Sequence, residues 1–194
     1  MKVAFERLLG GACYDNRDLV QHPEQVEVWE RALDGSPVDW PALFAEHRSV
    51  VDMTAALFFG ELADAFPKAL VVLSVRDADE WWRSFDGTVV DVLRNPKDDP
   101  LERALAPVRE FTVRMLETRF TPEWTDETSA KRAYARHNNA VRAAIPSPRL
   151  VEWRPGDGWD AICAALGVPV PSEQFPHVNT TADFREMAGR DPAR

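Results

Sequence analysis

The sequence predicts an α/β protein in which helices flank a parallel sheet, and three observations lead to this prediction. Short apolar runs recur at Ser49–Asp52, Ala69–Val75 and Leu150–Trp153, and helical patterns separate them. The run Ala69–Val75 is apolar on both faces, which is typical of a strand buried in a parallel sheet. Strands that alternate with helices in this way indicate an α/β fold. Ligands on such sheets bind beyond the carboxyl ends of the strands.

The first half of the chain contains three clear helical patterns. Lys2–Leu9 reads as a short helix that a pair of glycines ends. Apolar residues form a helical stripe along Glu24–Leu33, and Asp39 is expected to cap a short helix after it. A further helix is expected over Thr54–Phe66, because the next residue is a proline.

Four more helices are expected after the central apolar strand. They cover Asp77–Leu93, Leu101–Arg119, a segment that runs to about Ile145, and Gly158–Leu166. Pro107 should kink the second of these helices or divide it in two. Asp77 is expected to cap the first helix, and either Asp126 or Thr128 the third.

Composition limits the class of protein. The 194 residues carry 23 basic and 32 acidic side chains, a net charge of −9 that argues against a general nucleic-acid binder. The length fits a single domain over residues 1–194, with an irregular tail over residues 172–194. No apolar run approaches the roughly 18 residues of a membrane span, and no secretory signal is seen, so we expect a cytoplasmic protein. Cys13 and Cys163 are too few for a disulfide framework or a four-cysteine zinc site, and we expect no metal.

The segment Val71–Phe85 contains the most informative pair of polar residues. Arg76 ends the buried strand, and Ser84 follows eight residues later, a little over two helical turns. Both side chains could therefore converge on one anion, to which arginine offers forked donors and serine a hydroxyl. The alternative is that Arg76 pairs with Asp77 or Asp79 at the surface.

Several segments together resemble the sulfotransferase family. They are KVAFERLLGGACY, HPEQVEVWERALDGSPVDWPALF, SVVDMTAALFFGELADAFPKALVVLSVRDADEWWRSF, YARHNNAVRAAIPSPRLVEW and GDGWDAICAALGVPVPSEQFPHVN. The resemblance implies a P-loop NTPase-type fold. It also implies transfer of a sulfuryl group from 3′-phosphoadenosine 5′-phosphosulfate (PAPS) to a hydroxyl or amine of a small molecule.

The resemblance also assigns roles to residues. Arg76 and Ser84 match the positions that grip the 3′-phosphate of PAPS. Tyr134 and Trp81 become candidates for contacts around the nucleotide, although core packing is the favoured interpretation of Trp81. Asp52, at a predicted strand end, is the first candidate for the catalytic base, and a helix N-cap is its alternative role. Asp15 stands where family members often have a histidine, so it is not assigned that role.

One departure from the family concerns the start of the sequence. The family has a first strand and a loop around the 5′-phosphosulfate, which we expect to precede the helix Lys2–Leu9. We expect that strand to lie between Ala69–Val75 and Leu150–Trp153, whose edges would then lack a partner. Either these edges close on each other, another segment fills the gap, or the native chain is longer. An unpaired apolar edge can bind another chain, so a homodimer is also expected. The alternative function is a truncated or non-catalytic remnant of the fold that acts as a binding or oligomerising module.

Overall fold

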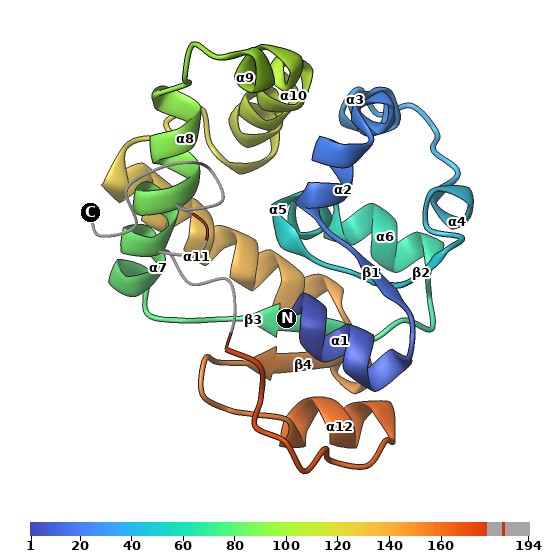
Figure 1. The fold of residues 1–194 in the computed structure, drawn as a ribbon. Coiled ribbons are helices and arrows are strands. Elements are labelled where there is room, and N and C mark those ends of the chain that lie inside the picture. Colours follow the sequence, from blue (N-terminus) through green and yellow to red (C-terminus); the bar gives the residue numbers. More distant parts are fainter. Residues whose placement is uncertain (178–183, 185–194) are drawn as a thin grey trace. The chain divides into compact units, whose positions relative to one another are not determined.

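The computed structural model describes residues 1–177 and 184, and its fold is mixed α/β, as predicted (Figure 1). Packing divides the chain into two compact units, which we describe one at a time. The first unit consists of Met1–Val75 and Arg136–Pro176, and the second is built on Arg76–Ala135. The single domain expected over residues 1–194 stays a prediction. Most of the tail expected over residues 172–194 lies outside the described residues.

The strands described in the first unit form two parallel pairs (Figure 1). In one pair β1 (Ala12–Tyr14) lies beside β2 (His47–Val50), and in the other β3 (Val71–Ser74) lies beside β4 (Leu150–Trp153). The main-chain N–H of Val75 extends the second ladder by donating to the carbonyl of Trp153 at 2.9 Å. Parallel pairing places the carboxyl ends of paired strands at the same edge.

Of the three expected outcomes for the edges of the second and third predicted strands, the structure shows the first, in which the two edges close on each other. β3 and β4 pair residue by residue over their whole length, so no strand lies between them. The physical reason is that their main-chain donors and acceptors satisfy one another directly, as buried polar groups must. Among the described strands, the break lies instead between the β1–β2 pair and the β3–β4 pair, which share no ladder.

Helices of the first unit surround these strands. They are α1 (Lys2–Leu9), α2 (Asn16–Gln21), α3 (Val26–Leu33), α4 (Trp40–Leu43), α5 (Asp52–Leu57), α6 (Phe59–Ala65), the second part of α11 (Glu127–Ala144) and α12 (Asp160–Leu166). Gly10 and Gly167 end α1 and α12 in the left-handed region, which glycine adopts without a Cβ clash. The helix expected over Thr54–Phe66 begins earlier, at Asp52, and is divided at Phe58.

Tryptophan and other aromatic side chains build much of the first unit's core. Trp29 is fully buried, and its indole N–H donates to the hydroxyl of Tyr14 at 3.0 Å. The rings of Trp40, Phe44 and Phe58 also lie against Trp29. Other buried residues pack β3 against α11 and α1 against α12; they are Leu73, Val75, Val141 and Ile145 in one cluster and Ala4, Trp159 and Cys163 in the other.

Arg149 closes the carboxyl end of α6. Its Nη2 donates to the carbonyls of Phe66 at 3.0 Å and Ala63 at 3.3 Å, and its Nε donates to the carbonyl of Ala69 at 2.9 Å. The last carbonyls of a helix have no partner within the helix. The Arg149 side chain, just ahead of β4, therefore supplies hydrogen-bond donors to main-chain carbonyls at the end of α6 and between α6 and β3.

The second unit is helical where it is described. Its helices are α7 (Ala78–Phe85), α8 (Asp91–Arg94), α9 (Pro100–Ala104), α10 (Ala106–Met115) and the first part of α11, with π-helical turns at Asp86–Val90 and Leu116–Phe120. The helix expected over residues 101–119 is divided at Leu105, two residues before Pro107. Asp77 caps α7 and Asp126 caps α11 through their carboxylates, which confirms both expected caps. No described helix is long and apolar enough to cross a membrane.

Candidate functional site

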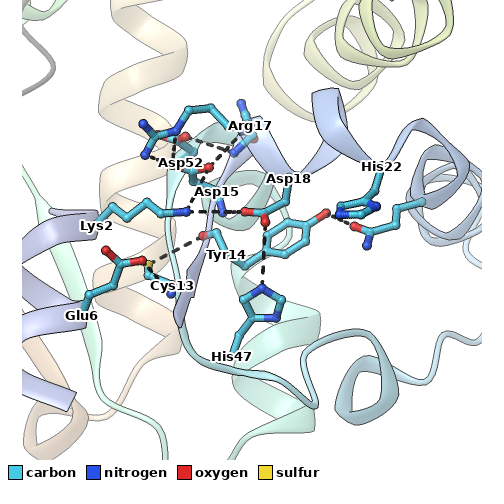
Figure 2. A network of polar contacts seen from close by, with 12 residues as sticks. Lys2, Glu6, Cys13, Tyr14, Asp15, Arg17, Asp18, His22, His47 and Asp52 are labelled. Carbon is cyan, nitrogen blue, oxygen red and sulfur yellow. Dashed lines mark hydrogen bonds and ion pairs between the residues drawn. The ribbon is translucent and has the colours of Figure 1, made fainter. Parts of the chain in front are cut away.

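Two carboxylates follow neighbouring strands of the first unit. Asp15 comes directly after β1, and Asp52 comes two residues after the end of β2. Between them the ladder continues, because the N–H of Val51 donates to the carbonyl of Tyr14 at 2.9 Å. Asp15 and Asp52 therefore lie at the carboxyl edge of a parallel pair, where α/β proteins bind ligands (Figure 2).

The backbone of Asp52 is strained. Its φ of 75° is the only positive φ of a non-glycine residue among the described ones. This region is unfavourable for residues with a Cβ, and such strain is concentrated at functional sites. The carboxylate does not cap its own helix; its Oδ2 accepts the main-chain N–H of Asn16, at the start of α2, at 3.1 Å. The alternative role of Asp52 as an N-cap is therefore wrong, because Val51 occupies that position.

Burial raises the pKa of the Asp52 carboxyl above its ordinary value. Asp52 is nevertheless an exposed residue, so solvent reaches its side chain and the increase in its pKa is limited by that contact with water. The Asn16 N–H, the Arg17 guanidinium and the amino group of Met1 partly oppose the effect, whereas the charge of Asp15 adds to it. A carboxylate of raised pKa is a better proton acceptor near neutral pH than an ordinary aspartate.

Asp15 has the opposite electrostatic environment. It is 2% exposed. Its Oδ2 accepts from Nε and Nη2 of Arg17 at 2.8 and 2.6 Å, and its Oδ1 lies 3.4 Å from Nζ of Lys2 (Figure 2). Burial alone would raise the pKa of Asp15, but the hydrogen bonds and charges of Arg17 and Lys2 outweigh it and lower the pKa. The pKa of Asp15 is thus lowered and that of Asp52 raised, although both residues follow neighbouring strands.

In the second unit, Arg76 is available to an anion. Asp77 is occupied in capping α7, and Asp79 accepts from Nζ of Lys131 at 2.6 Å. The alternative pairing of Arg76 with either aspartate is therefore not seen, and no ion pair to Arg76 occurs within residues 1–177. Ser84 lies half-buried in the last turn of α7, the helix that begins two residues after Arg76.

Aromatic packing surrounds α7. The ring of Trp81 lies parallel to that of Tyr134, with centroids 4.5 Å apart, and to that of Phe85, with centroids 5.0 Å apart. These contacts confirm the packing interpretation of Trp81. The hydroxyl of Tyr134 accepts the main-chain N–H of Arg76 at 3.0 Å, so Tyr134 fixes the chain where α7 begins.

His137, Cys13 and Cys163 contribute to packing. His137 lies edge-on to Phe59 with centroids 5.6 Å apart, and its burial lowers its pKa. Cys13 and Cys163 are buried, and burial raises the pKa of both thiols. Within the part of the chain that the structure describes, no group of His, Cys, Asp and Glu side chains could hold a metal ion.

Sequence reasoning missed β1 and α2, and with them Asn16 and Arg17. The signal available was the spacing of Asp15 and Asp18, which form a capping box at the start of α2. The Asp15 side chain accepts from the Arg17 N–H, and the Asp18 side chain accepts from the Asp15 N–H at 2.7 Å. Such a pattern marks a helix start, although the usual residue at the second position is Glu or Gln.

A profile described as a sulfotransferase domain matches residues 1–184. The chain belongs to the sulfotransferase family. It is also 28% identical over 193 residues to "Ava biosynthesis cluster protein M" of Aspergillus versicolor, in an alignment that covers 91% of this chain and 74% of that protein. This sulfotransferase-family chain therefore has Asp52 and Arg76 within the matched domain, one after β2 and the other just before α7.

Proposed function

We propose that this sulfotransferase-family protein transfers a sulfuryl group from PAPS to a hydroxyl or amine of a small molecule. The observation that carries the proposal is Asp52, a carboxylate of raised pKa held on a strained backbone at the carboxyl end of β2. Strain and an altered pKa at one residue are typical of a group that takes part in chemistry. The family match supplies the reaction class.

In this proposal Arg76 and Ser84 bind the 3′-phosphate of the donor. The Arg76 guanidinium provides charge and forked N–H donors, which suit a phosphate, and the Ser84 hydroxyl provides a further donor. The hydrogen bond from the Arg76 N–H to Tyr134 supports this role, because it fixes the main chain from which the Arg76 side chain extends.

Asp52 acts as the base for the acceptor. It takes the proton of the acceptor hydroxyl or amine while the oxygen or nitrogen forms a bond to sulfur. The bond between sulfur and the 5′-phosphate oxygen breaks, and its electron pair leaves with adenosine 3′,5′-bisphosphate. A positioned base contributes about 10²- to 10⁴-fold to such a rate.

The test is transfer from PAPS that carries radiolabelled sulfur to a panel of phenols, alcohols and amines. We expect labelled product with at least one class, and a fall of about 10²-fold or more in kcat for Asp52→Asn. Asp86→Asn, on an exposed aspartate of the second unit, is the matched control and should keep wild-type kcat. Binding of adenosine 3′,5′-bisphosphate without transfer to any class would instead support a non-catalytic binding module. Full activity of Asp52→Asn would overturn the role of Asp52.

A further inference from the structure

Asn16 connects two helices at the candidate site through two different groups. Its main-chain N–H donates to Oδ2 of Asp52 at 3.1 Å. Its side-chain Oδ1 accepts from the hydroxyl of Thr54 at 2.6 Å. A single residue at the start of α2 therefore bonds to the first and third residues of α5.

The bond between Thr54 and Asn16 is protected from water. Thr54 is 2% exposed, so its hydroxyl cannot readily exchange Asn16 for a solvent partner. A buried hydroxyl left without a partner is destabilising, which keeps the bond formed. The bond fixes Asn16, and with it the N–H that Asp52 accepts.

We propose that Asn16 and Thr54 are positioning residues that hold Asp52 in its strained conformation, with its carboxylate directed to the acceptor substrate. The proposal rests on the proposed function, because it assigns Asp52 a substrate to act on. A non-glycine residue at positive φ persists only where surrounding contacts hold it, and Asn16 provides such a contact from outside α5. Thr54 acts through Asn16 and does not itself touch the substrate.

Several charged groups face Asp52 and enter any titration of its carboxyl. They are Asp15 after β1, Arg17 on α2 and the amino group of Met1 ahead of α1. Lys2 and Arg17 both pair with Asp15, so the net field at Asp52 depends on α2 keeping its place. Release of the Asn16 side chain should therefore change both the solvation and the titration of Asp52.

Thr54→Val tests the proposal, because valine keeps the shape of threonine and removes the hydroxyl. Thr54→Ser restores a hydroxyl, and Thr112→Val is the matched control, since the Thr112 hydroxyl bonds only within its own helix, to the carbonyl of Val108. The first readout is titration of the Asp52 carboxyl by carbon-13 NMR, with its signal assigned through Asp52→Asn. The second readout is kcat and KM for sulfuryl transfer.

In Thr54→Val we expect the titration midpoint of Asp52 to move away from its wild-type value, because its bond to the Asn16 N–H and its exposure to water both change. We expect kcat to fall about 10- to 100-fold with little change in KM, because a small displacement of a catalytic group lowers the rate by about this factor. Thr54→Ser should restore both readouts, and Thr112→Val should match the wild type. Unchanged titration and kcat in Thr54→Val would overturn the proposal, as would failure of Thr54→Ser to restore them.

The two readouts separate this proposal from the proposed function. If the wild type transfers no sulfuryl group, the proposed function fails, while a shift of Asp52 titration in Thr54→Val alone still supports positioning. If Thr54→Val does not fold, Asn16→Ala takes its place, because alanine removes the side-chain acceptor and keeps the main-chain N–H. An Asp52 that titrates in Asn16→Ala as in the wild type would overturn the positioning role.

Discussion

The hydroxyl of Tyr134 accepts the main-chain N–H of Arg76 at 3.0 Å, across 58 positions of sequence. The ring of Tyr134 lies parallel to that of Trp81 on α7, with an angle of 11° between the planes. Tyr134 thus holds both the residue before the cap of α7 and the helix itself. The guanidinium of Arg76 extends from a fixed main chain, which reduces the entropy lost when it binds an anion.

Tyr134→Phe should weaken binding of adenosine 3′,5′-bisphosphate. The substitution removes the hydroxyl that accepts from the Arg76 N–H and lies 3.4 Å from the Arg76 carbonyl, and it keeps the aromatic ring against Trp81. The stronger of these hydrogen bonds is worth about 0.5–1.5 kcal/mol, so we expect the Kd to rise about twofold to tenfold. Isothermal titration calorimetry measures the change.

Tyr14→Phe is the matched control, since the chain has two tyrosines. The Tyr14 hydroxyl donates to Gln25 and accepts from Trp29 in the core of the first unit. Tyr14→Phe should reduce the free energy of unfolding and leave the Kd unchanged. Equal Kd values for wild type and Tyr134→Phe would show that the bond to Arg76 has no part in binding.

Asp52→Asn should stabilise the protein at neutral pH. Asparagine tolerates positive φ better than aspartate and carries no charge to desolvate. Because the folded pKa of Asp52 is raised, wild-type stability falls as pH rises through that pKa. We expect the free energy of unfolding to be higher than that of the wild type at pH 7, and this gain to shrink below about pH 4, in urea unfolding followed over pH. A loss of stability at pH 7 would contradict the strain assigned to Asp52.

Asp15→Asn should have the opposite effect and lower the free energy of unfolding at neutral pH. The folded pKa of Asp15 is lowered, so its contribution is complete above the unfolded value and is lost as pH falls through the folded one. We expect a loss of about 1–3 kcal/mol at pH 7, since charged hydrogen bonds to Arg17 disappear. The difference in the free energy of unfolding between Asp15→Asn and the wild type should become smaller below about pH 4. A difference that stays constant down to pH 2 would show that the Asp15 charge contributes nothing.

Arg149→Met should destabilise the first unit. It removes the Arg149 donor from the carbonyls of Ala63, Phe66 and Ala69, of which Phe66 keeps a bond from the main-chain N–H of Ala69. We expect a loss of about 1–3 kcal/mol in the free energy of unfolding, measured in urea. Arg142→Met is the control, because its ion pair with Glu152 joins side chains that are 38% and 36% exposed, and such a pair is worth about 0–1 kcal/mol. Equal losses in both variants would contradict the closing role of Arg149.

Local signals in the sequence predicted much of the fold correctly. The bounds of α1 and of β4 agree with the prediction, because a glycine ends the helix and the strand stands between turn residues. The caps at Asp39, Asp77 and Asp126 are confirmed for the same reason, since each side chain bonds to amides two or three residues on.

Pairing between strands could not be predicted from the sequence. β3 and β4 are separated by 75 positions, and no local pattern indicates that they lie side by side. β1 is three residues long, too short to show a periodic pattern, and without it the place of Asp15 beside Asp52 stayed hidden. The contact that Asp52 makes with Asn16 is equally non-local, since the two residues are 36 positions apart.

We propose that this sulfotransferase-family chain recognises a 3′-phosphate through Arg76 and Ser84. Calorimetric titration with adenosine 3′,5′-bisphosphate and with adenosine 5′-monophosphate, which lacks the 3′-phosphate, tests it most directly. We expect the bisphosphate to bind at least about tenfold more tightly to the wild type and to Arg83→Ala, a control on α7. Arg76→Ala should abolish that preference and Ser84→Ala should reduce it. Equal binding of both nucleotides by the wild type, or an unchanged preference in Arg76→Ala, would contradict the claim.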